Sequence, residues 1–281
     1  MISGSFREIV EQYEVVFFDS FGVLRNYDGM IPGVEKTFAF LRENNIDFYI
    51  LTNDASRGPK ELANKFQEMG LEEITRSKII SSGMLARNYL RNKVKNGTVT
   101  YLGTEKSAHY IETAGLKTLR IQDLSLKDID HINAMVLLDD EGYDWQGDVN
   151  KAINLLRMRN MPVIVANTDL TYPVSKGKIA LAVGALADMI EKIVQKSFIR
   201  FGKPDTQMFN FAYEHVLHTR LVDKNKILMV GDTLETDIIG GNKFGIDTAL
   251  VLTGNTPPEK AKMNIESTGI IPDYICSSAA V

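Results

Sequence analysis

Short runs of apolar residues, each followed by small or polar residues, recur along this chain. The run Val15–Phe18 holds four β-favouring residues in succession and stops at Asp19. A short continuous apolar run of this kind predicts a strand that is buried on both faces. Comparable runs predict further strands at residues 48–51, 99–102, 134–138, 163–166, 226–230 and 247–252.

Between these runs, apolar residues recur at intervals of three and four. Val34, Phe38 and Leu41 have this spacing, and they follow a Pro-Gly pair that suits a helix start. The same spacing predicts helices within residues 62–69, 84–90, 108–114, 149–159 and 185–194. Strands that alternate with helices predict an α/β fold with a doubly wound parallel sheet.

A polar, turn-forming stretch at residues 92–97 separates two rounds of this alternation. The pattern starts afresh after it, which predicts a second, smaller α/β domain inserted into the first. The predicted boundaries divide the chain into a first core part (1–93), an inserted cap domain (94–197) and a second core part (198–281).

Composition narrows the classes of function. The 281 residues carry a formal net charge of −4, so there is no overall positive field to attract nucleic acid or an anionic membrane. No run approaches the roughly 18 apolar residues of a membrane span, and the N-terminus lacks the pattern of a signal peptide. The single cysteine, Cys276, excludes an intramolecular disulfide. We therefore expect a soluble cytoplasmic protein.

Polar residues that could carry chemistry stand at the ends of the predicted strands. In an open α/β sheet, ligands bind at the carboxyl ends of the strands, which makes Asp19 the first candidate for a reactive group. Each other candidate is weak alone, since a hydroxyl at a strand end usually caps a helix and a lysine before proline is usually a solvated charge. These candidates are Thr52, Asn53, Lys203, Asp232 and Asp237.

The order of these residues resembles the signature of the haloacid dehalogenase superfamily over nearly the full length of the chain. Leu51-Thr52-Asn53, Gly202-Lys203-Pro204 and Gly231-Asp232-Thr233 match the branch with an inserted C2-type cap, the NagD-like and p-nitrophenyl phosphatase-like branch. Asn167-Thr168-Asp169 matches a motif of that cap. The resemblance implies a Rossmann-like core sheet and the hydrolysis of a small phosphorylated metabolite such as a sugar phosphate.

The resemblance also implies a role for each residue. Asp19 would be the nucleophile that forms an aspartyl-phosphate, and such an anion needs a hard cation beside it to meet a phosphate. A Mg²⁺ ion would be held by Asp19, the backbone carbonyl of Phe21 and Asp232, with Asp237 supporting the metal site. Lys203 would neutralise the phosphate.

The implied substrate contacts are shared between the two domains. Thr52 and Asn53 would donate hydrogen bonds to the phosphate, while Asn167 and Asp169 would line a substrate-facing loop of the cap. A homodimer formed through the cap is compatible with this branch.

One position departs from the family pattern. Phe21 stands where this branch has a second aspartate, the general acid and base, and a phenyl ring can transfer no proton. Three readings follow: a phosphatase that is slowed or specialised by Phe21, a phosphoryl-ligand binding or sensor protein with negligible turnover, and a dehalogenase-like hydrolase. A hydride-transfer enzyme is disfavoured because no Gly-x-Gly-x-x-Gly follows the first strand.

Overall fold

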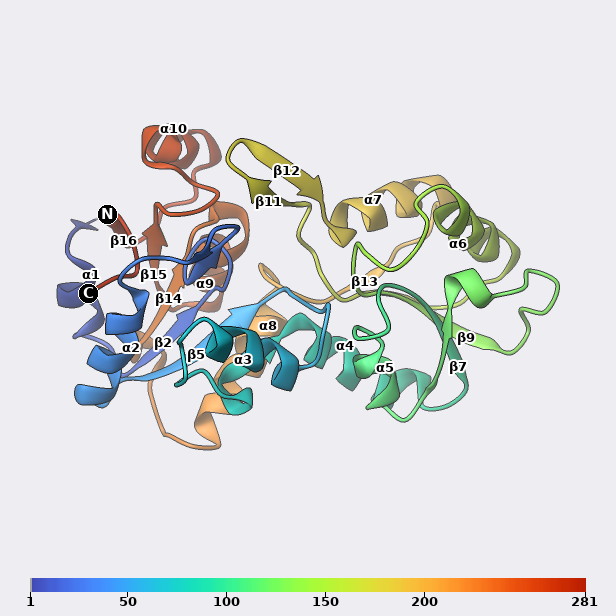
Figure 1. Ribbon diagram of the computed structural model, residues 1–281, viewed down its shortest axis with the longest axis horizontal. Coiled ribbons are helices and arrows are strands. Elements are labelled where there is room, and N and C mark those ends of the chain that lie inside the picture. Colours follow the sequence, from blue (N-terminus) through green and yellow to red (C-terminus); the bar gives the residue numbers. More distant parts are fainter. Residues whose placement is uncertain (1) are drawn as a thin grey trace. The chain divides into compact units, whose positions relative to one another are not determined.

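The computed structural model describes residues 2–281 and divides the chain into two compact units. The core unit comprises the chain up to Thr52, Pro59–Ile80 and Lys203–Val281, and the inserted unit comprises Asn53–Gly58 and Ser81–Gly202. Figure 1 shows the core unit in blue and in orange to red, and most of the inserted unit in green and yellow. The predicted boundaries at 93/94 and 197/198 remain predictions.

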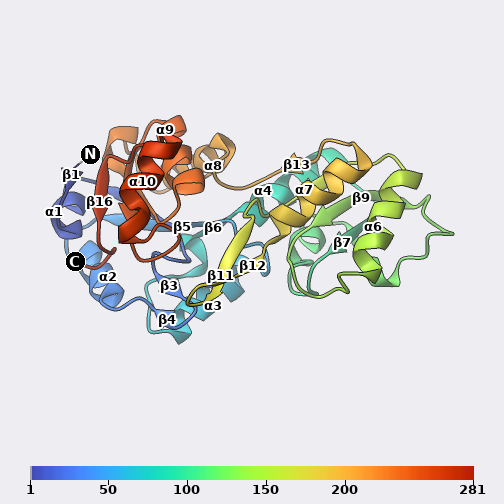
Figure 2. The same ribbon diagram turned by 90° about the horizontal axis from the view of Figure 1, so that it is seen from above.

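The core unit is built on a seven-stranded sheet with the order β1-β16-β15-β14-β2-β5-β6, and every pairing from β1 to β5 is parallel. Two further strands, labelled in Figure 2, form a separate antiparallel hairpin. The strands are β1 (Ile2–Ser3), β2 (Val15–Phe18), β3 (Arg25–Asn26), β4 (Gly29–Met30), β5 (Asp47–Thr52), β6 (Ile79–Ser81), β14 (Ile227–Gly231), β15 (Asp247–Val251) and β16 (Tyr274–Cys276).

Helices cover both faces of this sheet because its strands are apolar on both sides. Alternate strand residues such as Val16, Phe18 and Ile50 pack with α1 to α3, whereas Tyr49 faces His215 of α8. The helical segments are α1 (Phe6–Val10), α2 (Val34–Glu43), α3 (Pro59–Glu68), η1 (Arg76–Lys78), α8 (Thr206–Leu217), η4 (Lys224–Lys226), η5 (Leu234–Ile238), α9 (Ile239–Phe244) and α10 (Pro258–Thr268).

The inserted unit repeats the architecture on a smaller scale. Its five-stranded parallel sheet has the order β13-β10-β9-β7-β8, and α6 and α7 cover one face of it. Its strands are β7 (Thr98–Leu102), β8 (Lys117–Arg120), β9 (Ile132–Leu137), β10 (Val163–Val165) and β13 (Ile199–Arg200), with a separate hairpin of β11 (Thr171–Ser175) and β12 (Lys178–Leu181). Its helical segments are α4 (Ser82–Tyr89), η2 (Leu90–Val94), α5 (His109–Glu112), η3 (Ile121–Asp123), α6 (Gly147–Met158) and α7 (Val183–Val194).

The doubly wound α/β fold is confirmed, and each strand predicted from an apolar run is present within one or two residues. One local prediction was wrong in extent: the helix predicted at 108–114 is a single turn, α5. The sequence analysis predicted no strand at residues 171–175, which form β11. No helix in the described part of the chain is long and apolar enough to cross a membrane.

Candidate active site

Two adjacent core strands position the first two acidic residues of the site. β2 and β14 pair in parallel through Phe18 and Val230, and the backbone N–H of Asp19 donates to the carbonyl of Val230 at 2.9 Å. Asp232 follows the end of β14 by one residue. Both carboxylates therefore emerge at the carboxyl edge of the core sheet, as the apolar runs predicted.

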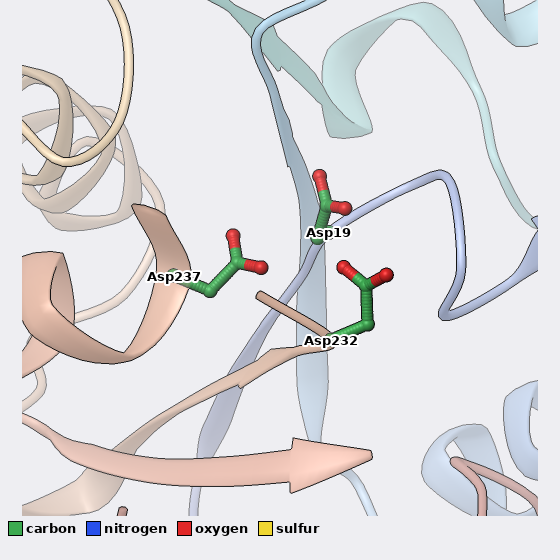
Figure 3. Close-up of side chains that lie close together, drawn as sticks. All are labelled: Asp19, Asp232 and Asp237. Carbon is green, nitrogen blue, oxygen red and sulfur yellow. The ribbon is translucent and has the colours of Figure 1, made fainter. Parts of the chain in front are cut away.

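A third carboxylate joins them from η5. The chain turns back after Asp232, and the carboxylate of Asp237 accepts a hydrogen bond from the backbone N–H of Thr233 at 3.2 Å. One oxygen from each of Asp19, Asp232 and Asp237 lies within 4.8 Å of the others, and Figure 3 shows the three side chains converging. We call these three residues, together with Lys203, the core acidic cluster.

Among the described residues, Lys203 is the only cationic side chain that forms ion pairs with these carboxylates. Its Nζ donates to Oδ1 of Asp19 at 2.5 Å and to Oδ1 of Asp237 at 2.6 Å, and the residue is only 2% exposed. One lysine cannot neutralise three ionised carboxylates, so all three can ionise together only if a further positive charge is present. Such a group favours a further cation.

Burial and charge shift the pKa values within this cluster. Burial raises the pKa of Asp232 well above its ordinary value, and the charges of Asp19 and Asp237 raise it further. Burial likewise raises the pKa of Asp237 to about 7, although Lys203 opposes the shift. Burial alone would lower the pKa of Lys203, but the carboxylates of Asp19 and Asp237 outweigh it and raise that pKa.

The residues present fit a hard divalent cation. Carboxylate oxygens are the ligands that Mg²⁺, Ca²⁺ and Mn²⁺ prefer, and two positions beside Asp232 are glycines. A Cβ at Gly22 or Gly254 would overlap the carboxylate of Asp232. Asp19 and Asp232 are the better candidates for direct ligands, because Lys203 engages only Oδ1 of Asp19 and does not pair with Asp232, whereas Asp237 accepts from Lys203 on one oxygen and from Thr233 on the other.

Phe21 lies in the turn that follows Asp19. This turn is closed by the backbone N–H groups of Leu24 and Arg25, which donate to the carbonyl of Ser20. The guanidinium of Arg25 lies 5.5 Å from the centre of the Phe21 ring. The Phe21 ring therefore makes a cation–π contact with Arg25. The ring itself has no group that could exchange a proton with a substrate.

The predicted substrate residues fall into both units. Thr52 ends β5 in the core unit, whereas Asn53, Asn167 and Asp169 belong to the inserted unit. The Asn53 amide donates to Oδ1 of Asp169 at 2.8 Å and to Oγ1 of Thr168 at 3.1 Å. Asn167 accepts a hydrogen bond from the backbone N–H of Asp169 at 2.8 Å. The structure thus brings Asn53, Asn167 and Asp169 together. The amide of Asn53 already donates its hydrogen bonds to side chains of the Asn167–Asp169 loop.

Sequence reasoning missed the residues that hold Asp232. Thr233 and Asn255 both donate hydrogen bonds to its carboxylate, and only Thr233 stood in a motif that the sequence analysis used. The glycine at 254, placed shortly after a predicted strand, was the available signal for a close backbone approach.

Comparisons with known proteins show the family of this chain. Residues 16–117 match the model of haloacid dehalogenase-like hydrolases, and residues 200–278 match a second model of similar hydrolases. A solved structure from Cytophaga hutchinsonii, described as a possible sugar phosphatase of this superfamily, is 53% identical, covers 100% of this chain and 99% of its own, and superposes with a TM-score of 0.96.

Two curated proteins are more distant relatives. Chronophin of Bos taurus is 28% identical over 284 residues, which cover 99% of this chain and 94% of that protein. Dihydroxyacetone phosphatase of Corynebacterium glutamicum is 29% identical over 236 residues, which cover 84% of this chain and 80% of that protein. The chain belongs to the haloacid dehalogenase superfamily.

Proposed function

We propose that this protein is a Mg²⁺-dependent phosphatase that acts on a small phosphorylated metabolite, such as a sugar phosphate, through an aspartyl-phosphate at Asp19. The single observation that carries the proposal is the convergence of Asp19, Asp232 and Asp237 with Lys203 at one edge of the core sheet. The names of the relatives support the substrate class, since they include a dihydroxyacetone phosphatase and a possible sugar phosphatase.

Asp19 is the nucleophile in this proposal. It is the most exposed carboxylate of the core acidic cluster: 14% of its side chain is accessible, against 1% of the Asp237 side chain, and Asp232 is 1% exposed as a whole residue. Its oxygen attacks phosphorus, the ester bond to the leaving oxygen breaks, and water then releases phosphate from the aspartyl-phosphate. Lys203 holds a positive charge beside Asp19 and can offset the charge of the incoming phosphate.

The metal site would be formed by Asp19 and Asp232, with the backbone carbonyl of Phe21 as a third protein ligand. When bound, Mg²⁺ would reduce the repulsion between the Asp19 carboxylate and the phosphate and would polarise the phosphoryl oxygens. Asp237 would act from the supporting position, because its hydrogen bonds hold Lys203 against Asp19.

Thr52 and Asn53 are proposed to contact the phosphate, and Asn167 and Asp169 the rest of the substrate. Since the Asn53 amide donates to Thr168 and Asp169, a phosphate would have to share or displace those bonds.

Phe21 favours leaving groups that need no proton. A general acid typically contributes about 10²–10⁴-fold to the rate, and its absence matters most when the leaving oxygen is strongly basic. Acyl phosphates and aryl phosphates should therefore be better substrates than alkyl phosphates. The same residue is the observation that favours the alternative function, a phosphoryl-ligand sensor with negligible turnover.

The test is a Mg²⁺-dependent assay with acetyl phosphate, p-nitrophenyl phosphate and an alkyl phosphate. Phe21→Asp should raise kcat for the alkyl phosphate by about 10²-fold or more and change acetyl phosphate least. Ligand-induced thermal stabilisation without turnover would instead support the sensor function. Chloride release from 2-chloropropionate in the absence of metal would support a dehalogenase.

A further inference from the structure

The carboxylate of Asp232 is held from two separate loops. Oδ1 accepts a hydrogen bond from the hydroxyl of Thr233 at 3.0 Å, and Oδ2 accepts one from the backbone N–H of Asn255 at 2.6 Å. The side-chain amide of Asn255 in turn donates to Oγ1 of Thr233 at 2.9 Å. This hydrogen bond connects two loops beside Asp232, because Thr233 and Asn255 lie 22 positions apart in the chain.

The direction of these bonds is set by chemistry. An amide nitrogen can only donate, so the bond from Asn255 uses the acceptor side of the Thr233 hydroxyl. The hydroxyl proton is then available to Asp232 and not to Asn255. Because linked hydrogen bonds polarise one another, the amide also strengthens the bond that the hydroxyl donates to the carboxylate.

Close packing leaves Asp232 little freedom around these bonds. Gly22 and Gly254 approach so closely that a Cβ at either position would overlap the carboxylate of Asp232. The hydroxyl of Thr253 donates to the carbonyl of Gly22 at 2.5 Å, which ties the turn after Asp19 to the loop that carries Asn255. If one of these donors were lost, the buried carboxylate of Asp232 would change its orientation, and few other groups could replace the lost hydrogen bond.

We propose that Asn255 is a positioning residue for the metal site, acting through Thr233 to fix the carboxylate of Asp232 for a divalent cation. This inference rests on the proposed function, because it concerns the Mg²⁺ ligand of that function. Residues that support metal ligands typically change metal affinity by about 10–100-fold when they are removed. Asn255 acts through one intermediate hydroxyl, so the lower end, about tenfold, is expected.

The test measures Mg²⁺ binding to the full chain without substrate, by isothermal titration calorimetry. Asn255→Ala removes the amide and keeps the backbone N–H, and it should raise the Mg²⁺ Kd about tenfold. Thr233→Val should weaken binding at least as much, and Thr233→Ser, which restores the hydroxyl, should recover affinity. In the assay, Asn255→Ala should raise the Mg²⁺ concentration needed for half-maximal rate and leave kcat at saturating Mg²⁺ within about threefold.

A double-mutant cycle distinguishes a relay from two independent contacts. If Asn255 acts through Thr233, then Asn255→Ala should add little to the effect of Thr233→Val. Additive effects would overturn the relay. Asn150→Ala is the matched control, since Asn150 is also an exposed asparagine with one side-chain amide hydrogen bond, which it donates to the backbone carbonyl of Gln146 in the inserted unit. It should bind Mg²⁺ as the wild type does.

Two further results separate this inference from the proposed function. Asp232→Asn should abolish Mg²⁺ binding, and wild-type protein that neither binds Mg²⁺ nor hydrolyses phosphoesters would overturn the proposed function and this inference with it. Wild-type binding and turnover with an unchanged Kd in Asn255→Ala and Thr233→Val would overturn the positioning role alone. Asn255 is exposed, and apo-protein melting curves would verify that the variants are folded.

Discussion

Acidic side chains gather after the strands of both parallel sheets, but the two groups are neutralised differently. In the core acidic cluster, Lys203 donates to two of the three carboxylates. In the inserted unit, Asp139 and Asp140 follow β9 and interact electrostatically with Asp54; we call these three residues the inserted acidic cluster.

The hydrogen-bond donors to Asp139 and Asp140 are neutral. Asp139 accepts a hydrogen bond from the hydroxyl of Thr104 at 3.2 Å, and Asp140 accepts one from the hydroxyl of Tyr172 at 2.7 Å. No lysine, arginine or histidine among residues 2–281 forms an ion pair with Asp139 or Asp140. Burial, with the charges of Asp140 and Asp54, raises the pKa of Asp139 to about 6.

The difference shows that carboxylates at strand ends do not define a metal or phosphate site by themselves. A buried cation opposes the rise in pKa that burial causes, as Lys203 does for Asp237, whereas no cation opposes that rise at Asp139. In the proposed function, Lys203 should therefore matter as much as Asp19. Three substitutions test this contrast.

The largest effect is expected for activity. Asp19→Asn removes the nucleophile and should lower kcat for p-nitrophenyl phosphate by about 10⁴-fold or more, because the other carboxylates of the cluster, Asp232 and Asp237, are buried. Asp139→Asn, the same change in the other cluster, should leave kcat within about threefold. Equal losses of kcat in the two variants, measured at saturating Mg²⁺, would contradict a functional difference between the two clusters.

The next effect concerns the stability of the metal-free protein. Lys203→Met leaves Asp19 and Asp237 without their shared cation and should lower the free energy of unfolding by about 3–5 kcal/mol at pH 8. The loss should be smaller at pH 5.5, because Asp237, whose pKa is raised to about 7, can then be protonated.

Urea denaturation in the presence of a chelator measures this loss. Lys151→Met is a suitable control, since Lys151 lies 3.8 Å from Asp148 but remains partly exposed, and exposed pairs contribute about 0–1 kcal/mol. A pH-independent loss for Lys203→Met would show that the lysine serves packing and not charge.

The smallest expected effect is a gain in stability, for Asp139→Asn. The pKa of Asp139 is higher in the folded protein, about 6, than its ordinary value of 3.8, so the folded state binds the proton more tightly and loses stability as the pH rises from about 4 through 6. Asp139→Asn removes that cost and should stabilise the protein by about 1–3 kcal/mol above pH 7, with little change below pH 4. Thermal melts across this pH range would reveal it, and destabilisation at pH 8 would contradict it.

The sequence predicted those parts of the molecule that depend on local patterns. The apolar runs located β2, β14 and β15, and thereby the strand ends that carry Asp19 and Asp232. The family resemblance added Lys203, whose pairing with Asp19 joins residues 184 positions apart. Neither apolar periodicity nor turn chemistry could have predicted that contact.

What could not be predicted depends on tertiary packing. The hydrogen bonds from Asn255 to Asp232 and Thr233 require the loop after β15 to approach the turn after Asp19, which no local signal specifies. β11 was hidden because Pro173 argues against a strand, and it is accommodated in a two-stranded sheet that consists of two edge strands. The occupied amide of Asn53 likewise emerges only from the fold.

The two glycines beside Asp232 constrain how this site can evolve. Gly22, at φ +83°, and Gly254 leave no room for a methyl group next to that carboxylate. Even the smallest side chain would push the acid away from its neighbours, and at position 22 it would also strain the backbone. In a saturation library selected for activity, these two positions should therefore retain only glycine, whereas the phenyl ring at position 21 should be replaceable. A proton donor at position 21 is thus easier to gain by mutation than the space beside Asp232 is to restore.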